Sequence, residues 1–196
     1  MNTTKILSIV ILVIALALGY YLFSSIKTDI DTTERIAKTE ARVINKLKMI
    51  REAQVAFQKV NGKYSGNWDE LLAFVDTGSF YITNKTEIII PLDYGADSIY
   101  VEIDTIGTVL VKDSIFSPSK FPNFDLATLP LIPGTDGKRF DMWADKIDKA
   151  GVMVDVVEVR DIAPVDPARK ESNEITNRKP LRFGSRTNIT TSGNWE

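Results

Sequence analysis

The chain has 196 residues, of which 44% are hydrophobic and 26% are charged, with a formal net charge of -2 and neither histidine nor cysteine. The absence of these two residue types removes most zinc, haem and iron–sulfur sites, the Ser-His-Asp and Cys-His forms of catalysis, and any disulfide. We therefore expect no enzymatic activity and no cofactor, and the length leaves room for one modest domain.

The first predicted element is a transmembrane anchor over residues 1–25. Eighteen uncharged residues run from Ile6 to Phe23. At about 1.5 Å per residue, a helix of that length covers roughly 27 Å of a hydrocarbon core ~30 Å thick. The alternative is a cleaved signal peptide, which would have a shorter apolar core followed by small residues. Tyr20 and Tyr21 occupy that position here and suit the membrane interface, so we favour the uncleaved anchor, with the lipid bilayer as a partner.

Two small residues in the anchor, Ala15 and Gly19, are four positions apart and therefore lie on one face of the predicted helix. Small residues allow transmembrane helices to approach each other closely. Ala15 and Gly19 are thus the candidate helix-packing residues for an oligomer formed through the anchor.

Charge is distributed unevenly after the anchor. Residues 26–64 carry nine Lys and Arg against five Asp and Glu, residues 65–163 carry eight against seventeen, and residues 164–196 carry six against four. The basic stalk either attracts anionic lipid headgroups or is a solvated helix face of mixed charge, and we favour the second interpretation. Four basic residues follow the anchor and one precedes it, which taken alone favours a cytoplasmic domain. No nucleic-acid partner is expected.

A helical stalk is predicted over residues 26–61. This segment lacks proline and glycine, and large apolar residues recur in it at helical spacing. They are Ile36, Val43, Leu47, Ile50, Phe57 and Val60. Asn61 and Gly62 should end the helix, because both residue types tolerate a positive φ. The apolar stripe could form a coiled-coil seam with a partner, but Glu40 and Gln54 interrupt it, so we favour packing on the protein's own domain.

A short second helix is predicted after the stalk. Asn67 can cap it, because its side chain can accept a hydrogen bond from a free backbone N–H of the first turn. Asp69 and Glu70 add negative charge at the N-terminal end, where the helix dipole favours it, and Gly78 is placed to end the helix.

The rest of the domain, which we place at residues 62–163, is predicted to be mostly β-structure. Runs rich in Ile, Val and Tyr mark the strands. They lie at residues 87–91, 98–104, 108–112 and 151–161, with a candidate edge strand at 129–132. Residues 105–107 should form the hairpin connection between the second and third of these strands. The predicted fold class is therefore α+β, with a long helix packed on a small antiparallel sheet.

Residues 164–196 are predicted to form a flexible tail, because apolar residues are scarce in most of this segment. Its end is less polar, with Leu181, Phe183, Ile189 and Trp195 placed among Gly, Ser and Thr. One interpretation is a strand that adds to the edge of a neighbour's sheet, which makes these four the candidate partner-binding residues of the tail. The other is a loosely docked or disordered terminus, which we favour.

Motifs for chemistry are scarce. Asp29, Asp31 and Glu34 cluster in the sequence as a cation site would require, but on a stalk helix they are more simply solvated side chains. The segment from Pro133 to Lys138 has neither the length nor the spacing of a Walker loop or an EF-hand loop. We assign no catalytic, cofactor-binding or metal-binding residue.

An apolar N-terminal helix that continues into an amphipathic one is followed here by Ala56-Phe57, Asn61-Gly62-Lys63-Tyr64 and Asp69-Glu70-Leu71. This order resembles type IV pilins and type II secretion pseudopilins, in which such a phrase closes the long helix and precedes a small antiparallel sheet. The resemblance covers Ile6 to about Lys112. Two family features are missing, namely a processing glycine before the apolar run and a glutamate within it.

The resemblance implies a membrane-anchored, pilin-like structural or assembly component of a bacterial cell-envelope machine for secretion or motility. Such a protein would sit in the inner membrane with its domain outside the cytoplasm, and its partners would be other membrane or envelope proteins. The alternative is an anchored, monomeric adaptor that captures a partner with its β domain or its C-terminal tail.

Overall fold

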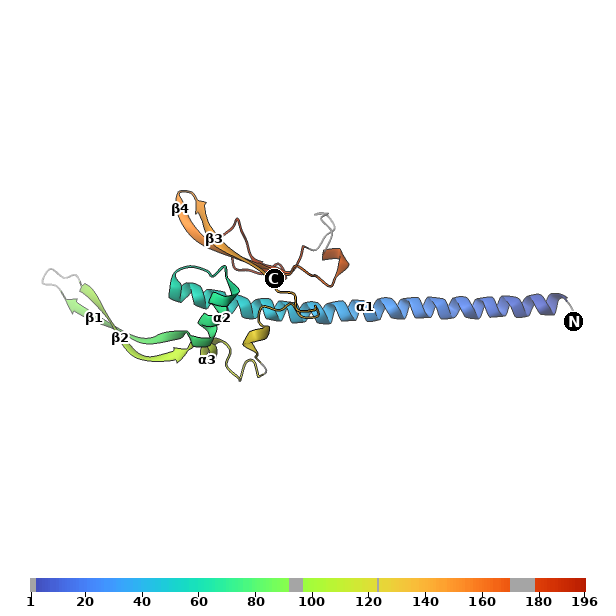
Figure 1. The fold of residues 1–196 in the computed structure, drawn as a ribbon, viewed down its shortest axis with the longest axis horizontal. Helices are drawn as coiled ribbons and strands as arrows, with labels where there is room; N and C mark the ends of the chain where they lie inside the picture. The colour runs from blue at the N-terminus through green and yellow to red at the C-terminus, as the bar shows by residue number, and fades with distance from the viewer. Residues whose placement is uncertain (1–2, 92–96, 123, 170–178) are drawn as a thin grey trace.

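The computed structural model describes residues 3–91, 97–122, 124–169 and 179–196. Its longest element is α1 (Thr3–Asn61), a helix of 59 residues that runs without interruption from the apolar segment into the head. Figure 1 shows the rest of the chain gathered around the C-terminal part of α1, while the N-terminal part stands alone. The predicted anchor and stalk are therefore one continuous helix, and the α+β fold class is confirmed.

The end of α1 follows from its sequence. The helix stops at Asn61, and Gly62 has a φ of 70°. The backbone N–H of Gly62 donates to the Gln58 carbonyl at 2.8 Å. Because most side chains are strained at positive φ, a glycine directly after the helix favours this ending. The predicted helix end is confirmed.

The head is built on one face of the C-terminal part of α1. The buried residues of this face are Val43, Leu47, Ile50, Ala53 and Phe57. They belong to a single core with residues of α2 (Trp68–Thr77), α3 (Val111–Ile115) and the strands of the head. This part of the apolar stripe therefore packs on the protein's own domain, as we favoured from the sequence. Val60 is an exception, since it is exposed.

The two polar residues that interrupt the stripe have partners within the head. Gln54 is fully buried and holds both backbone groups of Ser65. Its amide nitrogen donates to the Ser65 carbonyl at 2.7 Å, and its oxygen accepts from the Ser65 N–H at 3.0 Å. Glu40 accepts from two nitrogens of Arg169, with Nη2 lying 3.1 Å from Oε2. Both residues therefore fasten α1 to the head.

The short helix α2 begins and ends as predicted. The Asn67 side chain accepts a hydrogen bond from the Asp69 N–H at 2.9 Å. Gly78 follows the last helical residue, and its N–H donates to the Phe74 carbonyl at 2.8 Å. Phe74 also meets Phe57 of α1 edge to face, with ring centroids 5.1 Å apart. These contacts dock α2 onto α1.

Two antiparallel sheets lie on opposite sides of α1 (Figure 1). The first is a two-stranded ribbon made of β1 (Ser79–Pro91) and β2 (Asp97–Leu110). The second has the strand order β3-β4-β5, with β3 at Asp141–Lys149, β4 at Val152–Arg160 and β5 at Arg182–Gly184. Short 3-10 turns at Leu126–Thr128 and Pro167–Arg169 lie in the connecting segments.

The hairpin predicted at residues 105–107 is wrong. Thr105 pairs with Thr83 and Gly107 pairs with Ile82, so Ile106 is an extra residue within one long strand. The physical reason is that a glycine inside a strand pattern can mark a β-bulge as well as a turn. The strand predicted at 108–112 consequently ends at Leu110, where α3 begins.

The two later strand predictions had different outcomes. The strand predicted at 151–161 is β4. The candidate edge strand at 129–132 is reduced to a single bridge between Leu131 and Arg139. Pro130 and Pro133 flank that bridge and cannot donate backbone hydrogen bonds to extend it.

The end of the chain is packed on the head, which differs from the flexible tail predicted over residues 164–196. Leu181 and Phe183 are buried in the core, and β5 pairs with β4 from Glu158↔Gly184 to Arg160↔Arg182. The flexible-tail prediction is wrong for residues 181–184. A strand alternates its faces with a period of two residues, so two apolar side chains in this short segment suffice to bury one face. Residues 170–178 of the predicted tail lie outside the described residues.

Candidate interaction surfaces

The first surface is the uncovered part of α1. Every residue from Ile6 to Arg35 is exposed, and Thr39 is the first buried residue of the helix that the structure describes. The helix is long and apolar enough near its N-terminus to cross a membrane. A helix segment that is apolar on all sides needs lipid or other helices around it. This geometry supports single-pass attachment to a membrane.

The candidate helix-packing residues lie in this uncovered segment. The spacing of Ala15 and Gly19 places them on one face of α1. Nothing lies within 4 Å of the position that a Cβ atom on Gly19 would take. The face is open in the structure, and its contact with a second helix stays a prediction.

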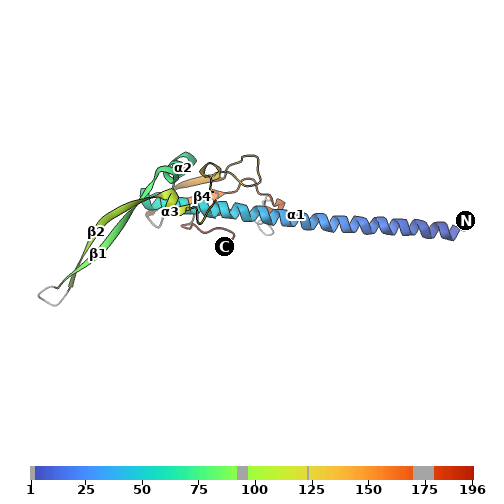
Figure 2. The same cartoon turned by 90° about the horizontal axis from the view of Figure 1, so that it is seen from below.

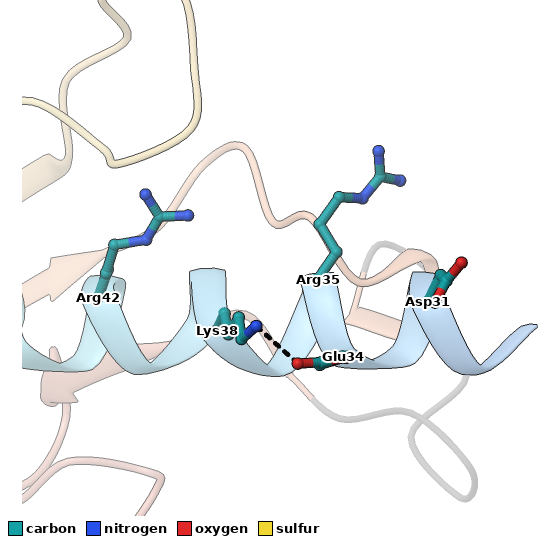
Figure 3. Close-up of a pocket in the computed structure, with 5 residues that line it drawn as sticks. All are labelled: Asp31, Glu34, Arg35, Lys38 and Arg42. Carbon is teal, nitrogen blue, oxygen red and sulfur yellow. Dashed lines mark ion pairs between the residues drawn. The ribbon is translucent and has the colours of Figure 1, made fainter. Parts of the chain in front are cut away.

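A shallow charged depression lies on the stalk part of α1 (Figure 3). It is lined by Asp31, Glu34, Arg35, Lys38 and Arg42. Lys38 and Glu34 form an ion pair of 2.6 Å across one helical turn, and both side chains are more than half exposed. Figure 3 shows Arg35 and Arg42 extending to the same side of the helix. Exposed pairs of this kind contribute about 0.3–0.5 kcal/mol, so we interpret the depression as a solvated surface of mixed charge.

The carboxylates of the stalk include Asp29, Asp31 and Glu34, which cluster in the sequence as a cation site would require. Glu34 is engaged by Lys38 and is largely solvated. Within the described residues, no group of three or more Asp or Glu side chains is placed to hold a metal ion.

Lipid headgroups are within reach of a small part of the stalk. At ~1.5 Å per residue, Lys27 lies about 6 Å along the axis beyond Phe23, whereas Arg35 lies about 18 Å and Arg42 about 28 Å beyond it. Attraction between exposed charges is screened over ~8–10 Å at physiological salt. Of these three cations, Lys27 alone is close enough to the end of the apolar segment for a strong headgroup contact.

The second surface is the ribbon of β1 and β2. Figures 1 and 2 show that it projects beyond the C-terminal end of α1, away from the N-terminus. Every residue from Tyr81 to Ile90 and from Ser98 to Ile106 is exposed, and most of the large side chains among them are apolar. An isolated two-stranded ribbon is marginally stable in water, and a large exposed apolar surface marks an interaction site. The ribbon is therefore a candidate binding surface.

The third surface is a groove of about 640 Å³ at the base of the ribbon. Its apolar lining comes from Val55, Ala56, Phe80 and Ile115. Its basic lining comes from Arg51, Lys59 and Lys120, against the single acid Glu52. Glu196 from the end of the chain already pairs with Arg51 at 2.6 Å. The groove therefore suits an apolar segment that carries negative charge.

The four tail residues that we considered for partner binding differ in their exposure to solvent. Leu181 and Phe183 are 1% and 0% exposed, so they contact the protein's own core. Trp195 is half-buried and packs against the same core. Ile189 is exposed and is the one residue of the four that is open to a partner. A strand of the tail, β5, does add to a sheet edge, but the edge belongs to β4 of the same chain and not to a neighbour, as the interpretation that we did not favour would have it.

An ion cluster around the buried Glu158 ties the tail to β3 and β4, and sequence reasoning missed it. Glu158 is 4% exposed, and its oxygens accept from Arg182 at 3.1 Å and from Arg186 at 3.0 Å. Arg186 also donates to Asp141 at 3.0 Å and lies over the Trp143 ring, 5.4 Å from its centroid. The available signal was an acid inside the apolar run of residues 156–159, because a buried charge needs a partner.

A second buried acid, Asp161, lies where the tail begins. It is 2% exposed, and its Oδ1 accepts from the Ala163 N–H at 2.8 Å. Burial raises the pKa of Asp161, while the hydrogen bond from Ala163 and the nearby Arg169 favour its charged form. Because Arg169 also pairs with Glu40 of α1, this group of residues fastens the start of the tail to the stalk.

The comparisons with known proteins leave the family open. No protein-family model matches the sequence, and neither the curated proteins nor the solved structures yield a match. The structure itself has a long apolar N-terminal helix packed with small antiparallel sheets, which is compatible with a pilin-like shape. The fold and surfaces thus define a class, that of an α+β head on a single helix able to span a membrane.

Proposed function

We propose that this protein is a membrane-anchored, pilin-like structural or assembly component of a bacterial cell-envelope machine of the secretion or motility type. The apolar end of α1 holds it in the inner membrane, and the head lies on the extracytoplasmic side. Its partners are other membrane or envelope proteins. The observation that carries the proposal is the uncovered part of α1, where every residue from Ile6 to Arg35 is exposed.

The packing of α1 explains how such a component would work. Leu47 and Ile50 are fully buried in the head, so the C-terminal part of the helix is held firmly by the core. The N-terminal part belongs to the same uninterrupted helix. A contact made by another protein along the uncovered part would therefore be transmitted to the head through a continuous helix.

Two absences refine the proposed role. The apolar run contains no glutamate, and no glycine precedes it at a processing position. In the pilins that the sequence resembles, these features accompany processing and the registration of subunits in a filament. We therefore propose a subunit that stays embedded in the membrane rather than one drawn out into a fibre.

Substitutions on the small-residue face of α1 test the lateral contact. Ala15→Leu and Gly19→Leu fill the face that a neighbouring helix would approach, and Ala17→Leu makes the same kind of change on the opposite side. The oligomeric state of the full-length protein in mild detergent is measured by analytical ultracentrifugation. We expect the first two variants to associate more weakly than the wild type, because they lose the contact between anchors, and Ala17→Leu to associate as strongly as the wild type. Association of Gly19→Leu as strong as that of the wild type would refute packing through this face.

The side of the membrane needs its own measurement. Protease added to intact spheroplasts should digest the head while leaving a cytoplasmic control protein whole. Digestion that requires lysis of the spheroplasts would place the head in the cytoplasm and would contradict the extracytoplasmic part of the proposal.

The groove at the base of the ribbon favours a second candidate function, that of an anchored adaptor. Its apolar lining and its basic residues Lys59 and Lys120 suit an acidic, amphipathic peptide. Lys59→Glu should abolish binding of such a peptide to the full-length protein, as measured by fluorescence anisotropy. Lys85→Glu on the ribbon serves as the control of equal charge change. Equal binding by both variants would exclude the groove.

A further inference from the structure

We propose that the ribbon of β1 and β2 is a contact surface between two copies of this chain, which pack the same face of their ribbons together. The two-fold axis of this dimer runs along the membrane normal. The inference rests on the proposed anchoring, because the shared membrane sets the orientation of the two copies. It adds a homotypic contact far from the anchor.

The direction of the ribbon decides which parts of two copies can meet. Copies inserted in one membrane through α1 have their helices pointing the same way and their heads at the same height. The ribbon continues past the C-terminal end of α1 in both views (Figures 1 and 2). Figure 2 shows that the ribbon is inclined to α1. Two neighbouring ribbons therefore meet at an angle, with each residue at the height of its own counterpart. A contact of this kind is isologous and has to be self-complementary.

The pairing register shows that the ribbon has two different faces. Residues opposite each other in antiparallel strands point to the same side. Ile89 pairs with Ile99, and Val101 and Ile103 follow on the same side at alternate positions. What we call the apolar face consists of Tyr81, Ile89, Ile99, Val101, Ile103 and Leu110. What we call the acidic face is the other side, which carries Glu102 and Asp104 together with the apolar side chains of Ile82, Ile88, Ile90 and Tyr100.

Charge decides which face can meet its own copy. On the apolar face, Lys85 and Glu87 form an ion pair of 2.9 Å, so the described side chains of this face carry no net charge. On the acidic face, Glu102 and Asp104 are two residues apart, and the described residues provide neither with an ion-pair partner. Packing two acidic faces together would gather four carboxylates, and like charges across strands destabilise. The apolar face is therefore the one that fits its own copy.

The exposed area also fits a dimer. The six apolar side chains expose on the order of 600 Å², at the upper end of the range for the largest apolar patch of a monomer. A stable interface of standard size buries about 800 Å² on each partner. The apolar face supplies most of that area, and Thr83 and Thr105, which pair with each other on the same side, extend it.

The lack of cysteine makes a direct test simple, because a single introduced thiol reports on the contact. Ile99→Cys places a thiol on the apolar face, and Tyr100→Cys places one on the acidic face. The two native residues are neighbours on β2 and are 62% and 60% exposed, so the variants are closely matched. Membranes containing each full-length variant are treated with a short bismaleimide and analysed on a denaturing gel.

We expect Ile99→Cys to give at least about tenfold more covalent dimer than Tyr100→Cys, which corresponds to about 1.4 kcal/mol of preference. Equal dimer in the two variants, or more in Tyr100→Cys, would overturn the assignment of the face. A cross-linked product of another mass without the dimer would mean that a different protein occupies the ribbon. No product in either variant would overturn the contact altogether.

A second pair of substitutions distinguishes loss of the contact from misfolding of the ribbon. In the Ile99→Cys background, Ile103→Lys places an unpaired cation in the contact and should lower the dimer at least about tenfold. Asp104→Lys makes a similar change on the acidic face of the same strand and should leave the dimer unchanged. Loss of the dimer in both variants would contradict the proposal.

The same membranes separate this inference from the proposed function. In the Ile99→Cys background, Gly19→Leu should leave the ribbon dimer intact. Gly19 belongs to the N-terminal part of α1 and Ile99 to β2, and these elements lie at opposite ends of the molecule (Figure 1). Extraction at alkaline pH tests the anchoring on its own. A protein that stays in the membrane but gives no ribbon dimer overturns the inference alone, whereas an extracted protein overturns the anchoring on which both depend.

Discussion

Replacing Phe183 by alanine should destabilise the head strongly, because this side chain holds the last strand in the core. Phe183 is 0% exposed and pairs with Val159 of β4. A buried Phe→Ala substitution costs about 3–5 kcal/mol through lost burial and the cavity left behind. Since domains have roughly 5–15 kcal/mol in total, the variant loses a large share of its stability. At about 2–4 °C per kcal/mol, the Tm should fall by roughly 6–20 °C.

Denaturant unfolding of the full-length protein in mild detergent measures this effect. The three tryptophans, Trp68, Trp143 and Trp195, all lie in the head, so their fluorescence follows the relevant transition. Ile189→Ala is the matched control, because Ile189 belongs to the same tail and is 59% exposed. Its free energy of unfolding should stay within about 0.5 kcal/mol of the wild type.

The result that would refute this reasoning is equal unfolding of the two variants. If Phe183→Ala and Ile189→Ala unfold at the same denaturant concentration, β5 does not hold the head together. The flexible tail predicted from the sequence would then be right for residues 181–184. Leu181→Ala, which removes the other buried side chain of this segment, should agree with Phe183→Ala in either case.

Three further predictions use the same unfolding assay. Gln54→Leu leaves two buried backbone groups without their partner and should cost about 1–3 kcal/mol for each; a neutral effect would contradict those hydrogen bonds. Gly184→Ala should destabilise the protein much more than Gly137→Ala. The two glycines have nearly the same φ, 76° and 78°, so the backbone strain is matched. A Cβ on Gly184 would lie 1.9 Å from a backbone oxygen, whereas a Cβ on Gly137 would have nothing within 4 Å. The raised pKa of Asp161 means that the folded state binds its proton more tightly than the unfolded chain. Its contribution to stability is therefore greatest below the ordinary Asp pKa of about 3.9 and declines as pH rises through the folded value. Asp161→Asn should remove this decline, so the difference in free energy of unfolding between the variant and the wild type should change across that pH range. A difference that stays constant with pH would contradict the raised pKa of Asp161.

Local features of the chain were predictable because neighbouring residues decide them. The course of α1, its end before Gly62 and the cap at Asn67 each depend on residues within a few positions of one another. The face of α1 that packs on the head could be predicted from the spacing of Val43, Leu47 and Ile50. These signals do not require knowledge of what lies across the core.

The ribbon shows where local signals stop being sufficient. Gly107 fits a turn between two strands and fits a bulge within one strand equally well. The choice between them was made by the pairing of Thr105 with Thr83, more than twenty residues earlier in the chain. A pairing of that range is a property of the folded molecule.

The sequence by itself determined that this protein has an apolar helix able to span a membrane, that the helix continues into the head, and that histidine and cysteine chemistry is absent. Tertiary structure decided that the tail packs on the head, how long the ribbon is and which residues pair with the buried charges. The physical reason is burial: Leu181, Phe183 and Glu158 acquire their roles from residues far away in the chain. A short apolar pattern in a polar segment does not reveal whether the surface it needs belongs to a partner or to the same molecule.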